Sequence, residues 1–336
     1  MSSDAQFIAY INNVSTKFNR YFSIFIFLFG TTGNILNILV LSQRSFRSNP
    51  CAIFFLVSSI ANLIAILTGL TSRTLSGWAA DLTNTDRCLC KLRAFVLNVA
   101  RPVAFWLILL AAIDRWLLSS ANVRYRQMST LKNAKRSIII VFILSIIIFC
   151  NILYCYEPNL INAPLKCYGA TVLCRLVTDL TFTFVSIFIP VFLMLIFGLM
   201  TINNIRQSRS HIEPGNTSTA TTIVSNRAKR RQHLNKNDYR LLMMLLLQIL
   251  LLIIFGLPLG IQKLYATITM YRPSTNIQVA IDNFIYSLVL LLNFLANGMP
   301  FYIYTLVGGN TFRKALFKLL VAIRQKISRL RRMVHL

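Results

Sequence analysis

The sequence has 336 residues, of which 56% are hydrophobic and 13% are charged, and its formal net charge is +26. Soluble domains have fewer apolar and more charged residues, so this composition indicates an integral membrane protein. A large positive charge is also typical of nucleic-acid-binding proteins. Here, however, Lys and Arg are interleaved with long apolar runs and accompany no zinc-finger or RNA-binding motif, which argues against nucleic acid as a partner.

Residues 1–20 form a polar amino-terminal segment. They contain no apolar stretch of the kind that a cleaved signal peptide requires, so we expect the first apolar run to act as an uncleaved insertion signal. Asn13 begins the sequon Asn13-Val14-Ser15 and is a predicted glycosylation acceptor if this segment lies outside the cell.

Seven apolar windows follow, each long enough for the roughly 20 residues that a membrane-spanning helix needs. The expected fold class is therefore all-α, a seven-transmembrane helix bundle over 21–305. The windows lie at about 21–42, 51–71, 92–118, 137–156, 178–203, 239–265 and 278–305.

The charged residues between the windows indicate the orientation. Lys and Arg gather in the first, third and fifth connections and beyond the seventh window, whereas the other side holds most of the acids. Basic loops stay cytoplasmic. We therefore expect an extracellular amino-terminal segment at 1–20, a third cytoplasmic loop at about 204–238, and a cytoplasmic segment at 306–336.

The third window joins Cys90 at one end to Asp114-Arg115-Trp116 at the other, with Arg101 between them. At ~1.5 Å per residue this stretch is about 37 Å long, enough to cross a bilayer. It resembles the third helix of the rhodopsin-like (class A) G-protein-coupled receptors, and among them the neuropeptide receptors of invertebrates. That helix begins with a disulfide cysteine and ends with Asp/Glu-Arg-Tyr, so Trp116 is a departure.

Other spans add to the resemblance and also depart from it. Ala61-Asn62-Leu63 is similar to a family signature in the second helix, but Asn62 replaces the Asp that binds sodium, so no sodium site is expected. Pro258 matches the proline of the sixth helix and is a candidate hinge. Gly256 stands where the family has a tryptophan that changes position on activation.

The seventh window ends in Asn297-Gly298-Met299-Pro300-Phe301-Tyr302-Ile303-Tyr304, which is similar to the family's Asn-Pro-x-x-Tyr signature. Either Pro300 or Tyr304 fits the register of that signature, and Tyr304 is favoured. Apolar residues then recur at helical spacing from Phe312, with Lys and Arg between them. We expect an amphipathic cytoplasmic eighth helix that lies on anionic inner-leaflet lipid.

Four cysteines fall on the expected exterior side, where disulfides persist. They permit three pairings, and the sequence cannot choose among them. The resemblance implies that Cys90 pairs with Cys167 or Cys174, and Cys88 could then pair with the other. A zinc site is disfavoured by the exterior location and by the spacing, and no metal site is expected. The remaining cysteines, interpreted as small buried or interfacial hydrophobes, are Cys51, Cys150 and Cys155.

The resemblance implies that Asp114, Arg115 and Trp116 couple the chain to a heterotrimeric G protein. Asp238 lies twenty residues before Pro258, where the family often has an acidic partner for this arginine. An acid near the start of a helix also interacts favourably with the helix dipole, so both roles for Asp238 stay open. The other predicted activation residues are Pro258, Pro300 and Tyr304.

Arg101 is a candidate ligand-binding residue. An arginine near the membrane centre costs on the order of 2.5–3.5 kcal/mol, so it must face the bundle interior or a wet cavity. Its guanidinium would bind a carboxylate, a sulfate or a peptide carbonyl, and an internal hydrogen-bond network is the alternative. The polar neighbours expected to line the same cavity are Asn98, Asn151, Tyr154, Gln262, Asn283 and Tyr286.

Competing classes of membrane protein fit less well. Residues 278–305 contain no lysine for a retinal Schiff base, and the apolar spans contain no catalytic cluster, so neither an enzyme nor a cofactor is expected. We expect a multi-pass plasma-membrane receptor that transmits the binding of an extracellular ligand to a heterotrimeric G protein. The resemblance implies a small peptide as the ligand, because most members of the family that lack an amine-binding aspartate in the third helix recognise peptides, and no carboxylate lies between Leu92 and Ile113. The alternatives are a small-molecule chemosensory receptor of the same fold and, less favoured, a membrane transporter.

Overall fold

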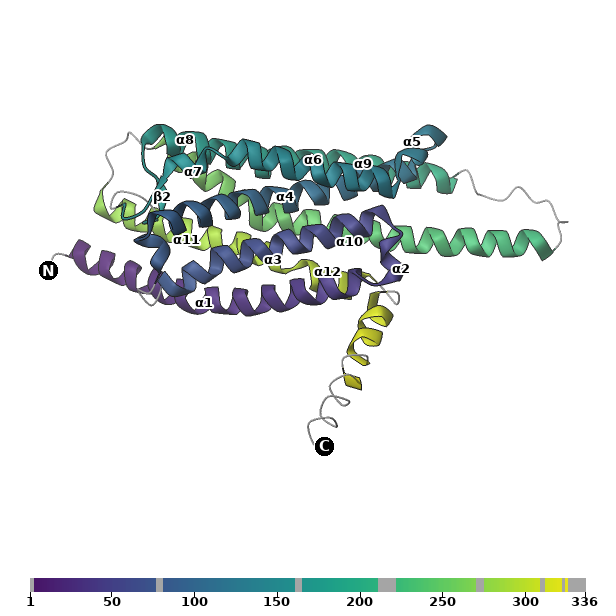
Figure 1. Ribbon diagram of the computed structural model, residues 1–336, viewed down its shortest axis with the longest axis horizontal. Helices are drawn as coiled ribbons and strands as arrows, with labels where there is room; N and C mark the ends of the chain where they lie inside the picture. The colour runs from purple at the N-terminus through teal and green to yellow at the C-terminus, as the bar shows by residue number, and fades with distance from the viewer. Residues whose placement is uncertain are drawn as a thin grey trace.

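The computed structural model describes residues 3–76, 81–160, 165–210, 222–269, 275–308, 312–321 and 324–325, except for the side chains at 3, 76, 208–210 and 222–241. Within these residues, seven helical segments are long and apolar enough to cross a membrane, as predicted. Figure 1 shows them side by side in one elongated bundle, with the amino-terminal helix leaving one end.

The first four spans are α1 (Ser3–Leu41), α3 (Pro50–Ser76), α4 (Arg87–Ser119) and α6 (Leu131–Phe149), and α6 leads into the short α7 (Ile152–Cys155). The fifth span consists of α8 (Val172–Thr181), η2 (Phe182–Phe188) and α9 (Ile189–Ser210), the sixth is α10 (Thr222–Ile268), and the seventh is α11 (Asn276–Gly298). The short elements in the connections are α2 (Arg44–Arg47), η1 (Leu82–Asn84) and α5 (Val123–Met128).

α1 begins at Ser3, well before the expected start of the first span near residue 21. Residues 3–21 contain neither proline nor glycine, the two residues that most disfavour a helix interior, so the helix continues through the polar segment. Its first turns extend beyond the rest of the bundle (Figure 1). The sequon residue Asn13 lies on this extension and is exposed.

Side-chain caps mark where several spans begin. The carboxylate of Asp86 accepts a hydrogen bond from Leu89 N at 2.7 Å at the start of α4. The hydroxyl of Thr130 accepts one from Asn133 N at 3.2 Å at the start of α6. Each cap satisfies an amide that the helix itself leaves unpaired, and α6 therefore starts six residues before its expected apolar window.

The fifth span contains a π-helical stretch, η2, directly before Pro190. Proline lacks an amide hydrogen, and its ring displaces the carbonyl four residues earlier, so the hydrogen bonds upstream shift by one residue and Ile189 N donates to Phe184 O. The wider turn leaves Phe182, Thr183 and Ser186 buried in the bundle. Such bulges often occur at functional sites.

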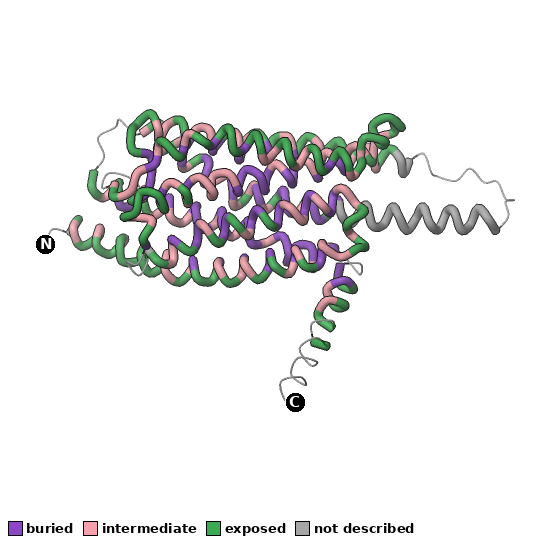
Figure 2. The backbone as a smooth tube through the Cα atoms, viewed as in Figure 1, coloured by how far each residue is buried: buried purple, intermediate pink, exposed green. Residues whose placement is uncertain are grey.

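α4 is the central helix and packs against α3, α6, α9 and α10. Figure 2 shows buried residues concentrated along the inner faces of the spans and exposed residues along the outer faces. The outward residues are apolar rather than polar, as on α6, where Ile139, Ile143 and Ile147 are exposed. An apolar outer surface is what hydrocarbon requires, because lipid tails are as apolar as leucine side chains.

Two disulfides close the exterior end, and one of them corrects the sequence prediction. Cys90 bonds to Cys167, with the Cα atoms 5.8 Å apart. Cys174 bonds to Cys155, at a Cα separation of 5.4 Å, and not to Cys88, which is an exposed free thiol. Two residues along an α-helix are rotated by about 200°, so Cys88 points away from the side on which Cys90 meets the loop. The interpretation of Cys155 as a hydrophobe was therefore wrong.

The disulfides flank a small hairpin in the second exterior loop. β1 (Tyr156–Glu157) pairs antiparallel with β2 (Tyr168–Gly169), and Tyr156 lies opposite Gly169. β1 follows Cys155 directly, and β2 follows Cys167 directly. The hairpin is thus bonded to the top of α4 on one side and to the first turn of α8 on the other.

The seventh span does not run unbroken to residue 305 as expected. α11 ends at Gly298, and α12 (Pro300–Val307) begins with Pro300 in its first turn, where the missing amide hydrogen costs nothing. α1 passes close to this break, since a Cβ on Gly298 would lie 2.9 Å from the Cα of Gly30. After α12 the chain turns at Gly308 into a helix at 312–321, the expected eighth helix.

Candidate functional site

Arg101 lies inside the bundle, on α4, and is 4% exposed. Its guanidinium carbon is 4.0 Å from the ring centre of Phe294 on α11 and 6.0 Å from that of Phe182 on η2. Both Nε and Nη2 are buried and have no hydrogen-bond partner among the described residues. Cation–π contacts stabilise such a charge by about 0.5–2 kcal/mol, far less than the cost of desolvating it. The site therefore has unused capacity for an anion or an acceptor.

The structure brings only some of the expected cavity residues to Arg101. Tyr286 is buried on α11 and close enough to interact electrostatically with the guanidinium. Asn98 is partly buried, and its amide donates to Ala94 O of its own helix at 2.8 Å. Asn151 and Gln262 are also partly buried, whereas Asn283 is exposed and Tyr154 is 86% exposed. Sequence spacing does not determine how each helix is rotated about its axis, so the prediction grouped residues that face different ways.

A buried ion pair that the sequence analysis missed lies beside Arg101. Lys263 of α10 pairs with Asp179 of α8, and their side chains are 9% and 7% exposed. The hydroxyl of Tyr168, on β2, lies 2.7 Å from both oxygens of Asp179 and donates to the carboxylate. Burial raises the pKa of Tyr168 well above its usual value, so this hydroxyl stays a donor. The network connects the second exterior loop to the fifth and sixth spans.

Phe182 joins the ion pair to Arg101. The Lys263 ammonium lies 5.3 Å from the ring centre of Phe182, the same ring that Arg101 approaches at 6.0 Å. Asp179 and Lys263 are charged residues inside the apolar windows predicted at 178–203 and 239–265, and this signal could have selected them. What it could not show was that the two side chains meet.

At the cytoplasmic end, the structure places Asp114 and Arg115 in a buried pair. Arg115 Nη2 lies 2.6 Å from Asp114 Oδ2 and 3.2 Å from Asn49 Oδ1. The other oxygen of Asp114 accepts a hydrogen bond from Ser129 at 2.5 Å, in the connection after α5. Trp116 packs between the rings of Tyr125 and Phe197, at 5.5 and 5.3 Å. Asp238 lies sixteen residues inside α10, which begins at Thr222, so the alternative that it stabilises the start of a helix was wrong. Its side chain is outside the described residues.

Tyr304 connects α12 to α10 in the same half of the bundle. Its hydroxyl donates to Gln248 Oε1 at 2.5 Å, and its ring packs on Phe55 at 4.9 Å. Pro258 lies within α10, and Pro300 begins α12. Gln248 was not predicted, although it is a polar residue in a long apolar run. Its bond to Tyr304 joins two of the elements expected to move.

The eighth helix has one packed side and one exposed side. Phe312 is buried against Phe301, with ring centres 6.2 Å apart, and Gln43 Nε2 donates to Ala315 O at 3.0 Å. Phe317, Leu320 and Val321 are exposed. The later part of the expected apolar stripe, at 322–323 and 326–336, lies outside the described residues.

Comparison with known proteins agrees with this arrangement. The family model of the seven-transmembrane receptors of the rhodopsin family matches residues 33–299. A neuromedin U receptor homolog of Caenorhabditis elegans is 23% identical over 268 residues, which cover 75% of this chain and 66% of the relative. The chain thus spans just under two thirds of the length of that relative.

Proposed function

Because the chain belongs to the rhodopsin family of seven-transmembrane receptors, we propose that it binds a small peptide outside the cell and activates a heterotrimeric G protein inside it. It is a multi-pass protein of the plasma membrane, and its described residues include seven helices long and apolar enough to span it. On this proposal residues 1–20 are extracellular, with Asn13 as a glycosylation acceptor, residues 204–238 form the third cytoplasmic loop, and 306–336 lie on the inner surface.

The observation that supports ligand binding most directly is the buried guanidinium of Arg101, with two nitrogens that have no partner among the described residues. A planar fork of donors suits a carboxylate or a peptide carbonyl. The ring of Phe182 lies next to both Arg101 and Lys263, so a ligand at Arg101 would change the surroundings of the Lys263–Asp179 pair between the fifth and sixth spans. A peptide ligand also agrees with the neuromedin U receptor name of the C. elegans relative.

Transmission to the G protein would use two pairs at the cytoplasmic end. Asp114 retains Arg115 in the bundle, and Gln248 retains Tyr304 against α10. An outward movement of α10 about Pro258 would break the bond to Tyr304 and open the space in front of Arg115. Ligand and G protein would both favour the opened state, which makes the two binding events mutually reinforcing.

The exposed face of the eighth helix supports contact with lipid. Arg313, Lys314 and Lys318 flank the exposed Phe317. An apolar strip between basic residues binds the boundary of an anionic leaflet, and each basic residue near that surface contributes about 1 kcal/mol. We place this helix on the inner leaflet.

The proposal is tested in cells that express the chain with a panel of G-protein reporters and are exposed to a library of synthetic peptides. The expected result is a response to one class of peptide that is lost in Arg115→Ala at equal surface expression. Lys91→Ala, on the exterior turn of the same helix, is the matched control and should respond normally. A peptide response that Arg115→Ala leaves unchanged would contradict coupling through this residue.

A further inference from the structure

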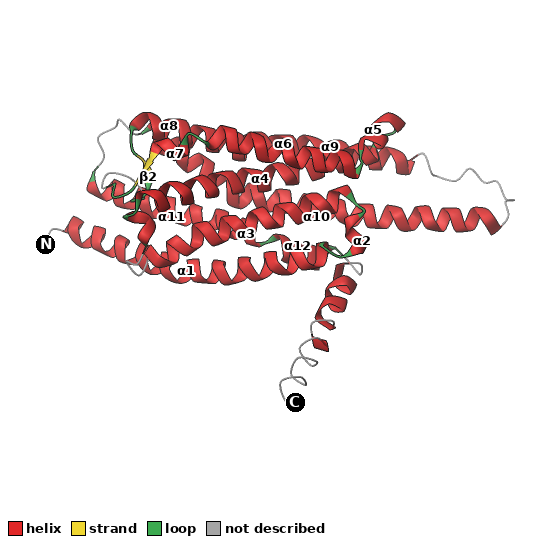
Figure 3. Ribbon diagram, viewed as in Figure 1, coloured by secondary structure: helices red, strands yellow, loops and turns green. Residues whose placement is uncertain are grey.

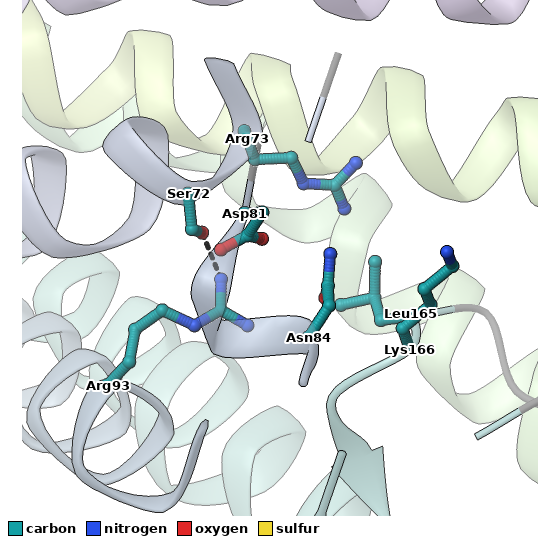
Figure 4. Close-up of a pocket in the computed structure, with 7 residues that line it drawn as sticks. All are labelled: Ser72, Arg73, Asp81, Asn84, Arg93, Leu165 and Lys166. Carbon is teal, nitrogen blue, oxygen red and sulfur yellow. Dashed lines mark hydrogen bonds between the residues drawn. The ribbon is translucent and has the colours of Figure 1, made fainter. Parts of the chain in front are cut away.

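A cavity of about 210 Å³ opens at the exterior end, away from the residues that the sequence analysis selected. Its lining includes Ser72 and Arg73 in the last turns of α3, Asp81 and Asn84 around η1, Arg93 of α4, and Lys166 of the second exterior loop. Figure 4 shows Arg73 and Arg93 extending toward the same space from different helices. The volume is several times the ~30 Å³ that one water molecule occupies in the liquid, so a side chain or a chain terminus would fit.

The two arginines have unused donors. Arg93 Nη1 donates to Ser72 Oγ, but its Nε is buried without a partner. Arg73 Nη1 donates to Asn19 Oδ1 at 3.3 Å, and its Nη2 is likewise buried and unpartnered. Neither guanidinium forms an ion pair with a residue that the structure describes. A buried donor left without an acceptor costs roughly 1–3 kcal/mol, and more when it is charged.

Asp81 neutralises only part of this charge. One of its oxygens accepts hydrogen bonds from Thr83 N at 3.0 Å and from Thr83 Oγ1 at 2.7 Å, so the carboxylate caps η1. Three basic side chains and one acidic side chain line the cavity, which leaves an excess of two positive charges. Arg73 and Arg93 also lie close enough to repel Arg101 electrostatically.

The positions of Arg93 and Arg101 set a length for what could join them. They are eight residues apart on α4, or about 12 Å along the helix axis. An extended peptide rises about 3.3 Å per residue, so two groups some three to four residues apart would reach both sites. The outer site lies at the exterior loops, and the inner one lies within the bundle.

We infer that the cavity of Arg73, Arg93 and Lys166 binds a second carboxylate of the extracellular ligand, so that the receptor recognises an acidic peptide with two carboxylates three to four residues apart. This inference rests on the proposed function, which needs only the inner site at Arg101. One of the two carboxylates can be the free carboxyl terminus of the peptide, and the other an acidic side chain. A basic or fully neutral peptide would leave the outer arginines unpaired.

The test uses four synthetic peptides and the purified full-length receptor in detergent at constant ionic strength. The probes are acetyl-Glu-Ala-Ala-Ala with a free carboxyl terminus, its carboxyl-terminal amide, and the two corresponding peptides with Gln in place of Glu. A ligand that binds only the folded state raises the melting temperature. At 10 mM, the peptide with both carboxylates should raise it by about 2 °C or more above either peptide with one, and the uncharged peptide should have no effect.

Arg73→Gln combined with Arg93→Gln should remove the advantage of the second carboxylate, whereas Arg87→Gln, an exterior arginine outside the cavity, should preserve it. Lys166→Gln changes only an exposed loop residue and should halve the extra rise in melting temperature that the second carboxylate gives. This variant replaces the double variant in the test if the double variant does not fold. The inference is overturned if both carboxylates give no advantage over one, or if the advantage persists in these variants. A rise in melting temperature that needs only one carboxylate on the peptide and only Arg101 on the receptor would overturn the outer site and leave the proposed function intact. In these variants, the two peptides with one carboxylate show whether each site binds the Glu side chain or the free carboxyl terminus.

Discussion

Replacing Asp179 by Asn should destabilise the receptor strongly, because the Lys263 ammonium would remain buried without its counter-charge. An exposed ion pair contributes less than about 1 kcal/mol, but these two side chains are only 7% and 9% exposed. Removing one partner of a buried pair costs about 3–5 kcal/mol. At ~2–4 °C per kcal/mol for a large domain, the melting temperature should fall by roughly 6–20 °C.

Thermal unfolding of four purified proteins, all in the same detergent, measures this effect: wild type, Asp179→Asn, Lys263→Met and the double variant. The double variant should be more stable than Asp179→Asn alone, since replacing a buried pair with uncharged groups is often nearly neutral. The two changes should therefore be non-additive by about 2 kcal/mol. Glu157→Gln, which breaks a more exposed pair with Arg87, is the matched control and should change the melting temperature little. The reasoning is refuted if Asp179→Asn melts within about 2 °C of wild type, or if the two single effects simply add.

Four further predictions concern other parts of the molecule. Cys90→Ala should abolish surface expression or ligand binding, measured by flow cytometry and a reporter assay, because it frees the loop that closes the exterior end; a full response at normal surface level would contradict this. Arg101→Lys should weaken agonist potency by tenfold or more, about 1.4 kcal/mol, at unchanged surface expression, whereas kept potency with failed trafficking would make Arg101 a structural residue. Asp238→Ala should raise basal G-protein signalling if Asp238 restrains Arg115, and unchanged basal signalling at equal expression would exclude that restraint. The hydrogen bond from Arg87 holds the pKa of Glu157 below its usual range. The stability that this pair contributes is therefore complete above the unfolded-state pKa and is lost as the pH falls below about 4. Glu157→Gln should flatten the plot of melting temperature against pH in that range, and an unchanged plot would exclude the pair as its cause.

The seven spans could be predicted because a chain that crosses hydrocarbon must satisfy its backbone within the helix and present about 20 apolar residues per crossing. Helix beyond the membrane gives no such signal, so the polar turns of α1 before residue 21 were missed. The break between Gly298 and Pro300 was visible in the sequence as Gly-Met-Pro. Apolar residues continue on both sides of it, however, and a hydropathy window cannot register an interruption that keeps the same polarity.

The candidate site was predictable as single residues and much less as contacts. Arg101 stands out because a cation in an apolar run is costly, and the Asp114–Arg115 pair follows from adjacency. The contact of Arg101 with Phe182 depends on the π-helical turn before Pro190, for which hydrophobic periodicity has no signature. The bond between Cys155 and Cys174 was missed for a related reason. Cys155 ends an apolar window, and only the folded loop brings it beside the first turn of α8.

The position of Pro258 in α10 gives the sixth span two arms of unequal length. Ten residues, about 15 Å at 1.5 Å per residue, separate the proline from the exterior end at Ile268, and thirty-six residues, about 54 Å, separate it from the other end at Thr222. If the helix turns as a rigid lever about Pro258, the end of the long arm moves more than three times as far as the end of the short arm. A 1 Å shift of the short arm at its exterior end, Ile268, would therefore move the far end of the long arm by about 3–4 Å. The exterior ends of α4, α7 and α8 are cross-linked to the hairpin of the second exterior loop, which provides a stiff support against which the short arm can turn.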